Sequence, residues 1–238
     1  MFTEDPKVEE WMAEIAARLD LLERSLPHRV DAMVSPESKL PFIALQYRAG
    51  LAWRMAELSR SAFEGFEANR LVSAILLTRA SVETGAGLWY LSAKIDAAVE
   101  RGTLGDSAQH LRRLHLGSKR NPAMPEAVNV LNFVDRVERD VKGFREQYDM
   151  LSEYAHPNWC GTAHLYSKPD PPNLWTDFGA NIRGATSARC IGVANLSTAL
   201  MFFEISYNRI ADAMPAFIEL CEAAGPFAGD EKPEKATE

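Results

Sequence analysis

The sequence predicts an all-α protein, a bundle of about six to seven helices. Apolar residues recur at three- and four-residue steps over most of the chain, and proline and glycine separate these runs. Of the 238 residues, 47% are hydrophobic, enough to bury a sizeable core. Because no composition break divides the chain, we expect one helical domain over 1–227, with an N-terminal helix at 1–26, a bundle core at 40–215 and a disordered tail at 228–238.

Start and stop signals place the first three helices. Asp5 can cap the first helix, and Pro6 fits its first turn. The second begins near Pro41, where leucine and alanine start to recur at helical spacing. The third covers about 69–99 and should stop at Gly102, since glycine readily adopts the left-handed conformation that ends helices.

Shorter helices follow. Asp106 and Gln109 resemble a capping box for a short helix that ends at Gly117. The spacing of valine and leucine predicts a fifth helix over about 128–141. Gly143 either kinks this helix or separates it from the next run, and Pro157 ends that run, because the residue before a proline is biased away from the α region.

Residues 157–185 are rich in Gly, Pro, Asn and Asp and predict one long irregular loop. A loop of this length is usually functional or a lid, unless it carries a short hairpin, and 163–166 could form one small strand. The last long helix runs from about 187 toward 220, and Pro215 should kink or interrupt it.

Composition also bears on compartment and partners. The net charge of −7 argues against a dedicated nucleic-acid coat, although a local basic patch is compatible with it. The three cysteines are widely spread without a CxxC pair, which favours a reducing cytoplasm. The acidic, amphipathic first residues do not form a signal peptide, and no apolar run reaches the length of a bilayer span. We therefore expect a soluble, cytoplasmic protein without a membrane partner.

The first candidate site group is Arg79 with Glu83, four residues apart on one face of an otherwise apolar helix. Small residues at 85–87 would let another helix or a ligand come close. One interpretation is an ordinary ion pair along the helix. The other is membership of a site, because burying two charges is unfavourable unless they pair or serve a function.

The second group lies just before the irregular segment. Ser152 and Glu153 precede His156 by four and three residues, so all three can share one helix face, with Tyr148 a turn earlier. Histidine titrates near neutrality, and a carboxylate can orient it for acid–base chemistry. The alternative is a histidine stabilised only by the dipole at the helix end.

Other chemistries have less support in the residues. Glu153-x-x-His156 has the spacing of dimetal sites, but such a site needs a second pair, and we predict no metal. No nucleotide fingerprint or phosphate-binding glycine loop is present, so we predict no cofactor. The basic stretch around Arg112 and Arg113 could contact RNA phosphates, or it could be a solvated helix face.

Two motifs resemble a known family. The run Leu-Leu-Thr-Arg-Ala-Ser-Val-Glu at 76–83 and the run Tyr-x-x-Leu-Ser-Glu-x-x-His-Pro at 148–157 resemble bacterial helical domains related to the HEPN superfamily, over roughly residues 40–215. The resemblance implies a homodimeric helical bundle with a polar cluster between two long helices. It also implies metal-independent RNA cleavage or nucleotide binding in a toxin or phage-defence context.

One feature of that family is missing. Its signature has four to six residues between an arginine and a following histidine on one helix, whereas ten residues separate Arg145 from His156. If the protein is a ribonuclease, His156 would act as general acid or base and Arg79 would stabilise phosphate charge. Glu83, Ser152 and Glu153 would orient them, and substrate contacts would come from Tyr148, Arg112 and Arg113. The competing hypothesis is a non-catalytic binding or dimerisation module with a buried structural network.

Overall fold

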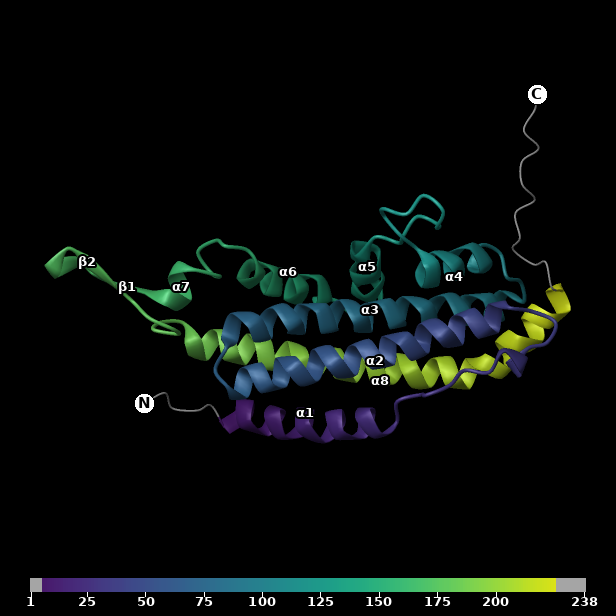
Figure 1. The fold of residues 1–238 in the computed structure, drawn as a ribbon, viewed down its shortest axis with the longest axis horizontal. Coiled ribbons are helices and arrows are strands. Elements are labelled where there is room, and N and C mark those ends of the chain that lie inside the picture. The colour runs from purple at the N-terminus through teal and green to yellow at the C-terminus, as the bar shows by residue number, and fades with distance from the viewer. Residues whose placement is uncertain (1–5, 226–238) are drawn as a thin grey trace, which may run out of the picture.

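The protein is a helical bundle, described by a computed structural model for residues 6–225 (Figure 1). This architecture confirms the predicted all-α class. Asp5 and the predicted tail at 228–238 lie outside the described residues. The elements are α1 (Pro6–Arg24), η1 (Ala32–Val34), α2 (Leu40–Glu67), α3 (Leu71–Arg101), α4 (Ser107–Leu116), α5 (Val130–Asp140), α6 (Phe144–Ala155), α7 (Ala163–Tyr166), β1 (Ser167–Asp170), η2 (Pro171–Asn173), β2 (Trp175–Phe178) and α8 (Ala185–Ala224).

Helix α3 lies at the centre of the bundle, because it is apolar on nearly every side. It packs most extensively against α8 and α2, which run alongside it. Helix α1 covers the far side of α2 and α8, while α4, α5 and α6 form an upper layer over the central helices (Figure 1). The buried side chains of all these helices belong to one continuous hydrophobic cluster.

Several helix ends follow the sequence signals. Gly102 ends α3 in the left-handed conformation, with φ of 65°, and its N–H donates to the carbonyl of Val99. Gly143 separates α5 from α6 with φ of 88°. The last turn of α6 ends at Ala155, with His156 as the capping residue before Pro157. Glycine is favoured at these left-handed positions because it has no Cβ.

Three local expectations were wrong. Asp106 does not cap α4 with its side chain; its carboxylate instead pairs with Lys94 and His110. Residues 163–166 form the helical turn α7 instead of a strand, because the N–H groups of Leu165 and Tyr166 donate to the carbonyl of Thr162. The short hairpin lies directly after it, with Ser167 opposite Phe178.

The third concerns one of the two outcomes expected at Pro215, an interruption of the last helix. Helix α8 continues without interruption past Pro215, whose exposed position lets the helix tolerate the missing N–H. Both α3 and α8 are long and apolar enough, by length and composition alone, to cross a membrane. The tested windows are 61% and 50% buried inside the bundle, and core helices pass the same test. Cytoplasmic localisation stays a prediction.

The close packing of α8 against α2 and α3 can be tested at Gly192. A Cβ there would lie 2.4 Å from Cζ of Phe66 and 3.1 Å from Cγ1 of Ile75, both of which are fully buried. We expect Gly192→Ala to lower the free energy of unfolding by about 1–3 kcal/mol, because the core is overpacked.

Gly50→Ala is the matched control, since a Cβ on this exposed position of α2 meets nothing within 4 Å. Removing glycine from a helix interior should leave stability unchanged or raise it by up to about 1 kcal/mol. Urea unfolding measures both changes. Equal stability of the two variants would contradict the packing described for Gly192.

Candidate functional site

A polar cluster of three residues joins α3 to α6. Arg79 Nη2 donates to the hydroxyl of Tyr148 at 2.8 Å, and the same hydroxyl donates to Oε1 of Glu83 at 2.9 Å. Arg79 Nε lies 3.4 Å from that Oε1, and the guanidinium carbon lies 5.1 Å from the centre of the Tyr148 ring. The phenol therefore bridges a cation and an anion that sit one helical turn apart.

The sequence places these three groups together through helical spacing. Arg79 and Glu83 share one face of α3 because they are four residues apart. On α6, Tyr148 shares the buried face with Phe144 and Leu151, and only 3% of it is exposed. Packing of α6 on α3 thus carries the phenol onto the ion pair.

The electrostatics of the cluster keep the phenol neutral. Burial raises the pKa of Tyr148, and the nearby Glu83 carboxylate acts in the same direction, while the hydrogen bond from Arg79 opposes them. The net shift is upward, so the hydroxyl remains protonated at neutral pH. It can then donate to Glu83 and accept from Arg79 at the same time, so the phenol links the two charged groups, whereas Nε of Arg79 has no hydrogen-bond partner within residues 6–225.

The second predicted group does not join this cluster. The Ser152 hydroxyl donates to the carbonyl of Tyr148 at 3.0 Å, within its own helix, and Glu153 accepts from the amide of Asn158 at 2.7 Å. His156 is exposed at the end of α6, two turns or about 12 Å beyond Tyr148 along the helix axis. Within residues 6–225, no hydrogen bond or ion pair links the His156 ring to Arg79 or Glu83.

The predicted substrate-binding arginines lie elsewhere. Arg112 and Arg113 are half-buried on α4, which sits in the upper layer with α5 between it and α6 (Figure 1). Arg113 Nε donates to the carbonyl of Glu126 at 2.9 Å and so fastens the segment after α4. The structure therefore does not bring these arginines to the polar cluster.

The hairpin carries apolar residues that the sequence analysis did not single out. Leu174, Trp175 and Phe178 are 91%, 58% and 78% exposed, and every residue of 171–180 is exposed. In Figure 1 the hairpin projects from one end of the bundle beyond α7. Large apolar side chains inside a segment otherwise rich in Gly, Pro, Asn and Asp were the signal that could have identified this surface.

Three pockets of about 240, 330 and 290 Å³ open elsewhere, and the described cluster residues line none of them. The first pocket is lined by α2, α8 and the segment 27–34 that follows α1. The second lies between α1 and α8, and the third lies beside the start of α6. Among residues 6–225, no three His, Cys, Asp or Glu side chains are grouped so as to hold a metal ion.

Comparison of the chain with protein families, curated proteins and solved structures gave no match. The relation to the HEPN superfamily therefore stays a prediction made from two sequence motifs. The features of the chain that bear on function are the Arg79–Tyr148–Glu83 cluster, the exposed His156, the projecting hairpin and the pockets.

Proposed function

We propose that this chain is a non-catalytic helical binding module that forms a homodimer through its projecting hairpin. The observation that carries the proposal is the exposure of Leu174, Trp175 and Phe178 on a two-stranded hairpin. An isolated hairpin of two strands is at best marginally stable in water. We therefore expect this hairpin to pack against a further strand or another protein surface. Contiguous exposed apolar side chains are typical of interaction sites.

The area involved is appropriate for part of a dimer interface. An aromatic side chain offers about 150–250 Å², so the exposed parts of the Trp175 and Phe178 rings contribute on the order of 300 Å². A standard interface buries about 800 Å² on each partner. Because Trp175 and Phe178 are three residues apart in β2, their rings lie on opposite faces of the strand, and a partner on one face would bury one ring, about a fifth of that area.

A second copy of the chain suits this surface because the hairpin has open edges. Strand β2 contains no proline, whereas Pro169 removes one N–H donor from β1. Two β2 strands could pair antiparallel around a two-fold axis and form one four-stranded sheet. Such pairing satisfies backbone groups and would place the Trp175 rings of both copies on one face of the joined sheet and the Phe178 rings on the other.

The contacts of Arg79 with Tyr148 and Glu83 support a structural role for Arg79. Its Nη2 is committed to Tyr148, and its charge is paired with Glu83. A phosphate bound here would compete with the Glu83 carboxylate for the positive charge of the guanidinium. Arg79 and Glu83, two of the side chains predicted for catalysis, therefore have an adequate explanation as part of the polar contact that holds α6 on α3.

The dimer can be tested by removing the apolar side chains of β2. We expect the wild-type chain of 26.5 kDa to sediment as a dimer at micromolar concentration, and Trp175→Ser/Phe178→Ser to sediment as a monomer. Analytical ultracentrifugation measures this, and circular dichroism checks that helix content is unchanged. Met33→Ser is the control, because Met33 is also highly exposed but lies in η1. A monomeric wild type, or a dimeric double variant, would contradict the proposal.

Metal-independent RNA cleavage is the second candidate, favoured by the exposed ring of His156 at the end of α6. Our proposal predicts that micromolar protein in EDTA leaves a mixed RNA pool intact, as measured by gel electrophoresis. The ribonuclease hypothesis predicts cleavage that is lost in His156→Ala and in Arg79→Ala while both variants stay folded. Observing that loss would replace the non-catalytic function with the enzymatic one.

A further inference from the structure

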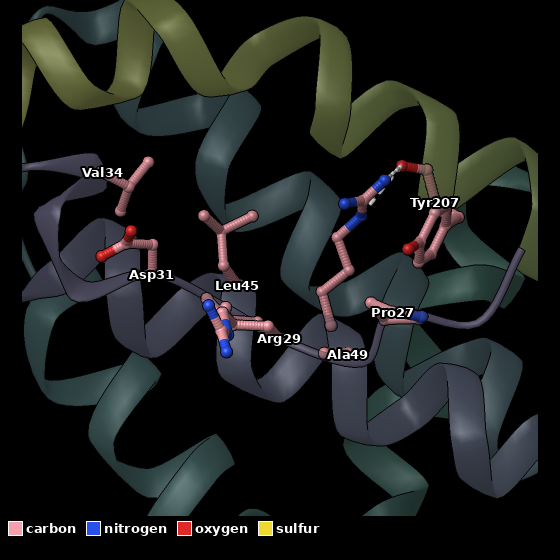
Figure 2. Close-up of a pocket in the computed structure, with 9 residues that line it drawn as sticks. Pro27, Arg29, Asp31, Val34, Leu45, Ala49 and Tyr207 are labelled. Atoms are coloured by element: carbon pink, nitrogen blue, oxygen red, sulfur yellow. Dashed lines mark hydrogen bonds between the residues drawn. The ribbon is translucent and has the colours of Figure 1, made fainter.

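An arginine without a carboxylate partner faces the smallest of the three pockets. Arg48 projects from α2 toward α8, where its Nε and Nη2 donate to the carbonyl of Tyr207 at 3.2 and 3.0 Å. Its guanidinium carbon also lies 3.4 Å from the centre of the Tyr207 ring. Figure 2 shows the hydrogen-bonded carbonyl of Tyr207 at one side of the pocket.

The charge of Arg48 is compensated only in part. Within residues 6–225 it forms no ion pair, and burial lowers the pKa of its guanidinium, with the Tyr207 hydroxyl acting in the opposite direction. A guanidinium has five N–H donors, and the Tyr207 carbonyl occupies two of them. Three donors remain, and a half-buried cation of this kind favours an anion beside it.

The rest of the pocket combines few charges with a mostly apolar wall. Arg29 and Asp31 lie at its edge, and the Asp31 Oδ1 accepts from the N–H of Met33 at 2.9 Å (Figure 2). With two arginines and one aspartate, the lining has one net positive charge. The remaining lining residues are apolar apart from Tyr207, namely Pro27, Val30, Val34, Leu45 and Ala49.

We propose that this pocket binds a small organic monoanion, a carboxylate that carries an apolar body. The carboxylate would accept from the free edge of the Arg48 guanidinium, whose planar donors match its two oxygens. The apolar body would lie against Val34 and Leu45, as in ligand sites that combine apolar walls with a few convergent polar groups. A volume of about 240 Å³ limits the ligand to a few carbon atoms or one ring.

A carboxylate fits this lining better than a free phosphate. Inorganic phosphate has no apolar part to fill the pocket, and its second negative charge would face the Asp31 carboxylate at the rim. Recognition of multiply charged phosphates generally relies on several arginines or lysines. Sodium benzoate is therefore a suitable probe, with benzamide as its neutral counterpart and inorganic phosphate as the alternative anion.

The test is a ligand-observed NMR titration at constant ionic strength. We expect benzoate to bind the wild-type protein with a Kd of about 1 mM. Benzamide should bind about tenfold more weakly, because hydrogen bonds to a charged group are stronger than neutral ones. No detectable benzoate binding, equal binding of benzamide, or tighter binding of phosphate would each overturn the proposal.

Two variants place the binding in this pocket. Arg48→Gln should weaken benzoate binding about tenfold, whereas the control Arg54→Gln, six residues further along α2 and outside the lining, should change it less than twofold. Ala49→Leu fills the pocket and leaves Arg48 in place, so it decides the question if Arg48→Gln fails to fold. Unchanged binding in folded Arg48→Gln, or in Ala49→Leu, would overturn the assignment.

Discussion

The structure depends on the burial of α3 between α2 and α8. Small residues allow the backbones of α3 and α8 to approach closely, since a Cβ on Gly85 would lie 3.2 Å from the carbonyl oxygen of Ala199 on α8. Between α2 and α3, the buried hydroxyls of Ser59 and Ser81 meet at 3.1 Å, so these two polar groups are paired inside the core. The upper helices and α1 pack on this central layer, and their positions follow from it.

On that layer, the contact of Arg79, Tyr148 and Glu83 fixes α6. Two charged groups at a helix interface are tolerated because each has a partner, and loss of one partner would leave the other poorly solvated. A network of this kind, which links side chains of two helices, stabilises one arrangement of those helices. Arg48 differs from Arg79 because it lines a pocket and forms no ion pair within residues 6–225.

Much of the fold could be predicted because helical periodicity and glycine or proline stops are local signals. The start of α6 after Gly143 and the end of α3 at Gly102 both followed from them. The contact of Tyr148 with the Arg79 ion pair could not be predicted in detail, since it depends on how α6 packs on α3. Residues 163–166 were misassigned because a four-residue segment has too little periodicity to distinguish a turn of helix from a strand. The capping role expected of Asp106 failed because Lys94 and His110 compete for its carboxylate.

The most direct measurement of the structural role of the cluster is a double-mutant cycle on urea unfolding with Arg79→Met, Tyr148→Phe and the combined variant. If the guanidinium and phenol stabilise the packing of α6 on α3, each single change destabilises the protein. The combined change then costs less than the sum of the two, with a coupling energy of about 0.5–3 kcal/mol. Additive effects within about 0.5 kcal/mol would show that the two groups do not support each other and would contradict the account.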